Sequence, residues 1–316
     1  MNRKFKILLA RPRGFCAGVV RAIDIVNKAI DRYGTPVYVR HEIVHNKRVV
    51  ETLRSRGAVF VKELDKIPDG ALTVFSAHGV SEAIENDAKD RGLPVIDATC
   101  PLVSKVHAEG RNHATHGHEV IMIGHSGHPE VEGTRGRVPG GVLVVSSTED
   151  VSRLEIKDPE KLAFVTQTTL SVDDTRDIIQ TLRTRFPAIQ GPDLKDICYA
   201  TQNRQQSVRD LCRSIDLLLV VGAQNSSNSN RLNEIGMEMN IESHLIDDAL
   251  SMQASWLDGV QTIGITAGAS APEELIDELL QAIAGLGETT VEEISDIVEN
   301  IQFKLPKNLT DPVVSK

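Results

Sequence analysis

Short apolar runs rich in Val, Ile and Leu recur along the chain and alternate with longer amphipathic segments. Each run is bounded by Gly, Pro, Ser or His, which is typical of strands that are buried on both faces. The pattern predicts strands at residues 6–10, 36–40, 71–77, 94–98, 119–125, 142–147, 161–167, 216–222 and 261–268. Between them, segments such as Val19 to Ile30 carry apolar residues at helical spacing. This alternation predicts an α/β fold with mostly parallel sheets.

Three cysteines divide the chain almost evenly, because 84 residues separate Cys16 from Cys100 and 98 separate Cys100 from Cys198. We therefore predict three similar α/β lobes that each contribute one cysteine to a common centre. Their expected ranges are 1–98 with Cys16, 99–196 with Cys100 and 197–285 with Cys198. Residues 286–316 are expected to form a tail that packs on the body, with one strand near residues 299–305.

Each of the three cysteines precedes a predicted helix, and Pro101 supports the helix start after Cys100. A helix start stabilises a thiolate through its unpaired N–H groups and its dipole. The fourth cysteine, Cys212, lies fourteen residues after Cys198. In one continuous helix the two would be about 21 Å apart at about 1.5 Å per residue, so Cys212 is interpreted as a packed residue.

The three remaining thiols allow three interpretations. They could be buried side chains without a ligand. They could hold zinc, although zinc sites built from thiolates usually have four ligands. They could also bind three irons of a [4Fe–4S] cluster and leave the fourth iron open to a substrate oxygen.

Polar side chains gather where the predicted strands end. In parallel α/β folds, ligands bind beyond the carboxyl ends of strands, where N–H groups and helix starts face them. The densest stretch is residues 225–230, in which every residue is Ser or Asn, and it favours a phosphate clamp of neutral donors. His45, His78 and His128 also lie at strand ends. By contrast, the histidines at 107, 113, 116 and 118 lie in a polar run and are expected to be solvated.

Several of these residues also have simpler explanations. Ser270 fits a capping box with Glu273, and Ser171 can cap its own helix. His128 and Glu130 lie two residues apart in a predicted loop, where they could relay protons or hold a metal.

Composition narrows the function further. A formal net charge of −9 without a basic patch argues against a nucleic-acid partner. No apolar run approaches the roughly 18 residues that span a bilayer, so no membrane partner is expected. Four cysteines without a C-x-x-C pair suggest thiols in the cytoplasm. The chain also lacks the glycine-rich dinucleotide and P-loop motifs, so a redox centre would receive its electrons from a partner protein.

The chain resembles the family of 4-hydroxy-3-methylbut-2-enyl diphosphate reductases, which act last in the methylerythritol phosphate route to isoprenoids. The resemblance is carried by "ARPRGFCAGVVRA", "YVRHEIVHN", "FSAHGVS", "DATCPLV", "GHPEVEGT", "TQTTLSVDDT", "DICYATQNRQ", "NSSNSNRL" and "TAGASAP". It implies three α/β lobes around a [4Fe–4S] cluster held by Cys16, Cys100 and Cys198. It also implies reductive dehydroxylation of the substrate to isopentenyl and dimethylallyl diphosphate, with a ferredoxin- or flavodoxin-type electron donor.

The resemblance also implies roles for individual residues. Glu130 would deliver a proton, and Thr168 would lie with it beside the substrate hydroxyl. The residues implied to bind the diphosphate are His45, His78, His128, Ser226, Ser227, Asn228 and Ser270.

Two functions from other classes compete with this hypothesis. A zinc-dependent hydrolase built on His125, His128 and Glu130 would contain one zinc and need no reductant. A binding module for a phosphorylated metabolite would keep its affinity after all three cysteines are replaced.

Overall fold

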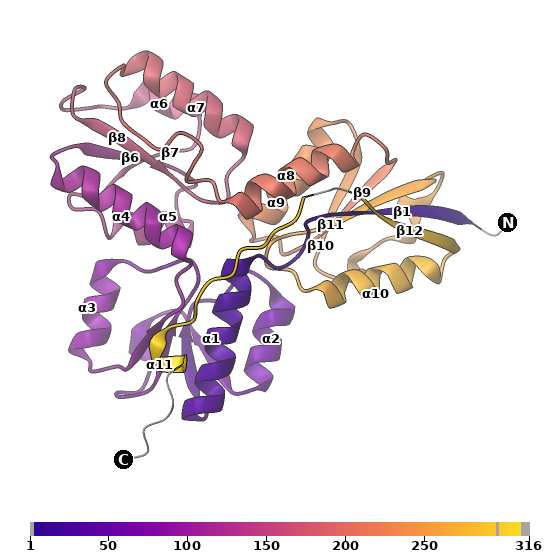
Figure 1. Ribbon diagram of the computed structural model, residues 1–316, viewed down its shortest axis with the longest axis horizontal. Coiled ribbons are helices and arrows are strands. Elements are labelled where there is room, and N and C mark those ends of the chain that lie inside the picture. Colours follow the sequence, from indigo (N-terminus) through magenta and orange to yellow (C-terminus); the bar gives the residue numbers. More distant parts are fainter. Residues whose placement is uncertain (1–2, 295–296, 311–316) are drawn as a thin grey trace. The chain divides into compact units, whose positions relative to one another are not determined.

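The computed structural model describes residues 3–294 and 297–310, which form three sheets in which every strand pair is parallel (Figure 1). The predicted α/β class is therefore confirmed, and each of the nine predicted runs contains a strand. The chain separates into two compact units. Unit 1 comprises Met1–Val19, His45–Val49 and Tyr199–Ile301, and unit 2 comprises Val20–Val44, Val50–Cys198 and Gln302–Lys316.

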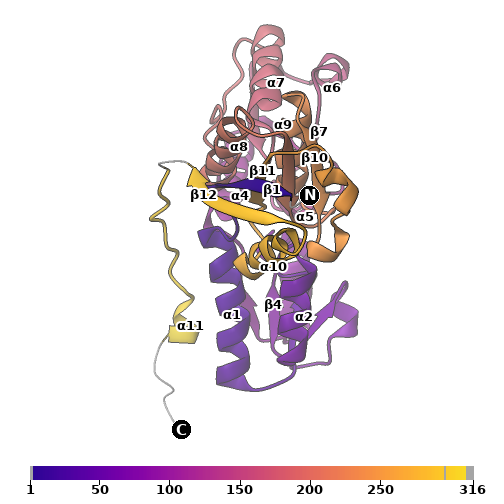
Figure 2. The same ribbon diagram turned by 90° about the vertical axis from the view of Figure 1, so that its right-hand side faces the viewer.

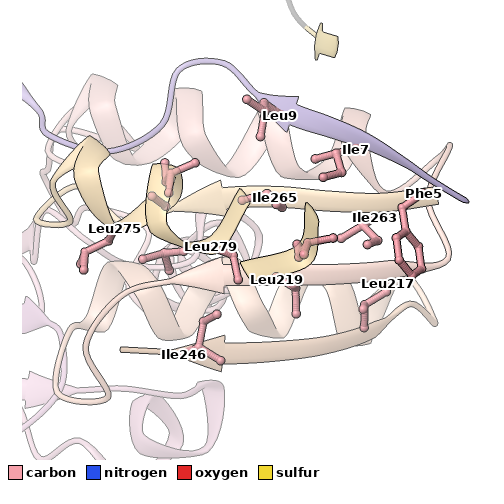
Figure 3. Close-up of a cluster of buried hydrophobic side chains, with 14 of the residues drawn as sticks. Phe5, Ile7, Leu9, Leu217, Leu219, Ile246, Ile263, Ile265, Leu275 and Leu279 are labelled. Atoms are coloured by element: carbon pink, nitrogen blue, oxygen red, sulfur yellow. The ribbon is translucent and has the colours of Figure 1, made fainter. Parts of the chain in front are cut away.

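Unit 1 contains one sheet with helices on both faces. The strand order is β10 (Glu242–Ile246), β9 (Leu217–Val221), β11 (Thr262–Ala267), β1 (Lys4–Ala10) and β12 (Glu288–Ile294). Its helices are α8 (Tyr199–Leu211), α9 (Ser227–Glu238) and α10 (Glu273–Ala284). Because successive strand residues point to opposite faces, Ile7 and Leu9 pack with α10, whereas Leu8 packs with α8 and α9. Figure 3 shows the α10 side of this core, in which Leu275 and Leu279 of α10 belong to one cluster with Ile265 and Leu219 of the sheet.

The first sheet of unit 2 has the order β3 (Ala58–Val61), β2 (Val37–Arg40), β4 (Thr73–Phe75) and β5 (Val95–Asp97). It is accompanied in the sequence by α1 (Ala17–Tyr33), α2 (Lys47–Ser55) and α3 (Glu82–Asp90), and the first turns of α1 and α2 belong to unit 1. Ala88 of α3 packs in one cluster with Phe75 and Leu93. The same unit includes α11 (Lys307–Thr310), which Figures 1 and 2 show beside α1. There the Tyr33 hydroxyl donates to the Asn308 carbonyl (3.1 Å).

The second sheet of unit 2 has the order β7 (Leu143–Val145), β6 (Glu119–Ile123) and β8 (Leu162–Thr166). Its helices are α4 (Pro101–Thr115), α5 (Pro129–Arg135), α6 (Thr148–Arg153) and α7 (Val172–Arg185). Val106 of α4 and Val131 of α5 pack on one face, and Val151 of α6 and Leu182 of α7 pack on the other. Burial of both faces explains why these strands read as continuous apolar runs.

The sequence did not predict three strands, which are β3, β10 and β12. Each of them lies at the edge of its sheet. The expected strand near residues 299–305 was wrong, since the strand after α10 is β12 and residues 297–306 contain no helix or strand. β12 pairs with β1, so one sheet draws on both ends of the chain. The division into lobes at residues 98, 196 and 285 stays a prediction.

None of the helices within residues 3–294 and 297–310 combines the length and the apolar composition that crossing a bilayer requires.

Candidate functional site

The three singled-out cysteines each stand one residue before a helix: Cys16 before α1, Cys100 before α4 and Cys198 before α8. All three cysteines are partly exposed. Cys212 follows directly after α8, where it is buried, and burial raises the pKa of its thiol to about 11. The structure therefore separates three accessible thiols at helix starts from one inert thiol in the core.

Each of these cysteines is held by the same kind of backbone hydrogen bond, from its N–H group to a carbonyl oxygen of another segment of the chain. The N–H of Cys16 donates to the carbonyl of Ala269 (3.1 Å), and the N–H of Cys100 donates to that of Ala77 (2.9 Å). The N–H of Cys198 donates to the Thr168 carbonyl (3.0 Å). Ala269 and Ala77 directly precede Ser270 and His78, and Thr168 is itself one of the site residues indicated by the sequence.

Glu130 lies in the first turn of α5, and only 2% of its surface is exposed. Its carboxylate accepts from the Thr168 backbone N–H (2.8 Å) and from the Thr168 hydroxyl (3.0 Å). Burial raises the pKa of Glu130 to about 7, although the two bonds from Thr168 act in the opposite direction. Because the Thr168 carbonyl also holds the N–H of Cys198, one residue connects the carboxyl group to that cysteine.

Two histidines implicated by the sequence lie close together in unit 2. The rings of His78 and His128 are edge to face, with their centroids 6.1 Å apart. His128 also caps α5, because its Nδ1 accepts from the Glu130 backbone N–H (3.2 Å). The cap fixes Glu130 within the first turn of the helix and keeps the His128 imidazole next to it.

In unit 1, the residues implicated by the sequence lie at two loops. The Ser270 hydroxyl donates to the His45 carbonyl (2.9 Å), and Asn225 Nδ2 lies 3.3 Å from His45 Nδ1. The expected capping box of Ser270 with Glu273 was wrong, because Pro272 precedes α10 and the Ser270 hydroxyl bonds to His45 in its place.

The start of α9 carries the run of Ser and Asn residues. Ser226 caps this helix, since its hydroxyl accepts from the Ser229 N–H (3.3 Å). Asn228 is 4% exposed, and within the described part of the chain neither its Oδ1 nor its Nδ2 has a hydrogen-bond partner. Buried polar groups are normally paired, so this amide is suited to a ligand.

The predicted exposure of one histidine was wrong. His107 is only 3% exposed, and burial lowers its pKa to about 4, so it is not the solvated side chain that the polar run predicted. It packs against the Gly79 backbone, where an added Cβ would lie 2.6 Å from its Cε1. The capping role expected for Ser171 is confirmed, because its hydroxyl accepts from the Asp174 N–H (3.1 Å).

A buried carboxylate beside Cys198, which the sequence did not indicate, forms an ion pair with a partly exposed lysine. Lys105 Nζ lies 2.8 Å from Oδ1 of Asp196, whose side chain is fully buried two residues before Cys198. The Asp196 Oδ2 accepts from the Thr166 N–H (3.3 Å). Only the position of Asp196 next to the cysteine motif could have drawn attention to it.

No group of three His, Cys, Asp or Glu side chains within the described ranges converges on a position for one metal ion. In an iron–sulfur cluster each cysteine binds a separate iron atom, so its ligands need not converge on a single point.

Parallel sheets whose carboxyl ends carry accessible thiols, imidazoles and a buried carboxyl group define an α/β enzyme. The sequence profile of the LytB protein family matches residues 7–284, and the chain therefore belongs to this family. A relative from Zymomonas mobilis, a 4-hydroxy-3-methylbut-2-enyl diphosphate reductase, is 59% identical over 304 residues. That match covers 96% of this chain and 89% of the relative.

Two further comparisons agree with this assignment. The 4-hydroxy-3-methylbut-2-enyl diphosphate reductase of Burkholderia pseudomallei is 56% identical over 308 residues, covering 98% of each chain. The solved E-1-hydroxy-2-methyl-but-2-enyl-4-diphosphate reductase from Plasmodium falciparum has a TM-score of 0.91 and 36% identity, covering 98% of this chain and 97% of that one. The expected family and enzyme class, a reductase, are confirmed.

Proposed function

We propose that this enzyme reduces (E)-4-hydroxy-3-methylbut-2-enyl diphosphate to isopentenyl diphosphate and dimethylallyl diphosphate. The allylic C–O bond breaks, the oxygen leaves as water, and a C–H bond forms on the allyl group. Two electrons and two protons balance the reaction. The names of the relatives support this substrate, and the site supplies side chains suited to each part of it.

We propose that Cys16, Cys100 and Cys198 hold one [4Fe–4S] cluster. The fit rests on donor chemistry, because three partly exposed cysteines each stand at a helix start, where a thiolate is stabilised. When bound, such a cluster would supply single electrons and an iron with an open position for the substrate oxygen.

The diphosphate is assigned to neutral and imidazole donors. They are His45, His78, His128, Ser226, Ser227, Asn228 and Ser270. The buried amide of Asn228 at the start of α9 supports this assignment, since α9 is twelve residues long and its N-terminal N–H groups also favour an anion. The imidazoles can donate to phosphate oxygens from either ring nitrogen when protonated.

The observation that carries the proposal is the buried Glu130 carboxyl group held by Thr168. With a pKa raised to about 7 by burial, Glu130 can hold a proton near neutral pH. A protonated carboxyl group at Oε2, next to the Thr168 hydroxyl, can protonate the leaving oxygen and so convert hydroxide into water. Thr168 keeps the carboxyl oriented during this transfer.

The electrons are proposed to come from an external protein of the ferredoxin or flavodoxin type, since the sequence has no dinucleotide-binding motif. We place the reaction in the cytoplasm, where a reducing environment keeps ligand cysteines as thiols.

Anaerobic purification followed by iron and sulfide analysis tests the proposal. We expect about four irons and four sulfides per chain, the composition of a [4Fe–4S] cluster. The protein should also release both products when supplied with substrate and a chemical reductant. Cys100→Ser should lose the cluster, and Cys212→Ser is the matched control that should keep it.

Two other results would contradict the proposal. One zinc per chain with activity in the absence of reductant would support the hydrolase on His125, His128 and Glu130. Full substrate affinity without turnover or cluster would support a binding module.

A further inference from the structure

Arg204 of α8 is a fully buried cation beside the turn that precedes Cys16. Its guanidinium donates to the carbonyl oxygens of Gly14 (2.8 Å) and Phe15 (3.4 Å), the two residues directly before Cys16. It also donates to the Glu299 carboxylate (3.0 Å). Burying a guanidinium group is unfavourable unless its N–H groups are all engaged, so these bonds hold the turn in a fixed place.

Arg21 of α1 makes the same kind of contact beside another cysteine. It donates to the carbonyl oxygens of Ala98 (3.3 Å) and Thr99 (3.0 Å), the two residues directly before Cys100. Its Nε also donates to the Lys304 carbonyl (2.9 Å). Two arginines from different helices thus contact equivalent positions before two different cysteines.

These contacts fix the peptide group that precedes each cysteine at both ends. In a trans peptide the C=O and the following N–H point in opposite directions. On one side, an arginine holds the carbonyl of Phe15 or Thr99. On the other side, the N–H of Cys16 donates to Ala269 and that of Cys100 to Ala77. The plane of each preceding peptide group is therefore set, and the helix that follows each cysteine limits its φ, so that rotation about χ1 is the main freedom left to place Sγ.

Both arginines are in turn held by residues 297–306, which contain no helix or strand and which we call the C-terminal strap. Glu299 accepts from Arg204 and from Asn203 Nδ2 (3.0 Å), and the Lys304 carbonyl accepts from Arg21. A segment without regular structure is thus ordered by contacts with two buried or partly buried cations.

We propose that Arg21 and Arg204 are positioning residues for the cluster, and that the C-terminal strap keeps their guanidinium groups in place. The inference rests on the proposed function, because it takes Cys16 and Cys100 as ligands. The two cations also lie near ligands of a negatively charged group, where they favour the reduced form that carries one more electron.

The test compares anaerobically loaded wild-type protein with Arg21→Gln, Glu299→Gln and the control Lys28→Gln, whose side chain is exposed on the same helix as Arg21. Three quantities are measured: the rate of iron release to a chelator, the reduction potential of the cluster, and the urea unfolding midpoint of the apoprotein. We expect Arg21→Gln and Glu299→Gln to release iron about tenfold faster, the lower end of the effect of losing a supporting contact at a metal site. Arg21→Gln should also shift the potential to a more negative value, whereas Lys28→Gln should match the wild type.

A general loss of folding would lower the unfolding midpoint but would leave the potential of the remaining clusters unchanged, and that result would overturn the inference. Iron release and potential equal to those of Lys28→Gln would overturn it as well, while leaving the proposed function intact. A wild-type protein that takes up no cluster would instead overturn the proposed function, and this inference with it.

Discussion

The Glu130 side chain shows two opposing influences on one carboxyl group. Burial disfavours the charged form, whereas the N–H and hydroxyl of Thr168 favour it, and burial prevails with a pKa of about 7. A general acid works best when its pKa lies near the operating pH. The Glu130 environment thus matches the task of protonating a leaving oxygen.

Replacing Glu130 with Gln should therefore lower kcat by a factor of about 10² to 10⁴, the usual contribution of a general acid. The amide keeps the shape of the side chain, so substrate affinity should change little. Steady-state kinetics with a chemical reductant and substrate titration measure the two effects. Glu132→Gln, on the exposed side of the same helix, is the matched control, and an undiminished kcat in Glu130→Gln would remove Glu130 from the proton path.

The same carboxyl group should make the stability of the apoprotein depend on pH. The folded-state pKa of about 7 lies above the ordinary value of 4.5, so between these pH values the folded state binds the proton that the unfolded state has lost. The free energy of unfolding must then fall as pH rises through this window, by about 3 kcal/mol in total. Urea unfolding of wild type and Glu130→Gln from pH 4.5 to pH 8 should show the variant gaining relative stability with pH. A difference that stays constant across this range would contradict the assigned cause.

For individual residues, the sequence indicated which side chains belong to the site better than it indicated which side chains are buried. Glu130 and Thr168 were found through their motifs, but the bonds between them depend on how α5 packs near the end of β8. His107 was misassigned because its neighbours in the sequence are polar, whereas its burial is set by the close approach of the Gly79 backbone. Local composition carries no signal of such a contact.

Among the elements, the three missed strands share a position at the edge of a sheet. The predicted strands are apolar because helices or other chain segments cover them. The missed strands β3, β10 and β12 all lie at sheet edges, and they were missed for different reasons. β12 is mostly exposed and polar, and β10 begins with Glu242 and Ser243, so both resemble loops. β3 is apolar but only four residues long. The edge strands β5, β7 and β8 were predicted, so hydrophobic patterning misses an edge strand mainly where its sequence is polar.

Gly79 follows His78 and lies at the contact between the β4 loop and α4. Its φ of +80° is unfavourable for an alanine, and an added Cβ would overlap the buried His107 ring. Gly79→Ala should therefore destabilise the protein by about 3 kcal/mol, from a strained backbone and an overpacked core together. Gly117→Ala is the control, because Gly117 has a φ of +83° with no atom near the added Cβ, and its cost should be about 1 kcal/mol. If urea unfolding gave the same loss in the free energy of unfolding for both variants, the His107 side chain would have moved to make room for the added methyl group.

For the whole molecule, the sheet of unit 1 was the least predictable feature. Its strand β1 lies between β11 and β12, which come more than 250 residues later in the chain. Nothing in the local pattern of residues 4–10 distinguishes this pairing from a pairing with the next strand, because a short apolar run does not specify its partners. The even spacing of the cysteines suggested lobes that are continuous in sequence, whereas strand pairing depends on contacts that the spacing does not record.

The wide separation of Cys16, Cys100 and Cys198 in the sequence also leads to a prediction about stability. An unfolded chain holds three such distant cysteines together only at a large cost in entropy, so a cluster that needs all three binds the folded state preferentially. Preferential binding to the folded state raises the free energy of unfolding. The cluster-loaded protein should therefore unfold at a higher temperature than the apoprotein, under anaerobic conditions in which the thiols remain reduced. The increase in Tm should disappear in Cys16→Ser and persist in Cys212→Ser, whose substituted residue is packed in the core and lies outside the ligand set. Cys16→Ser retaining the full increase would mean that the two other cysteines suffice, and the assignment of Cys16 as a ligand would then be wrong.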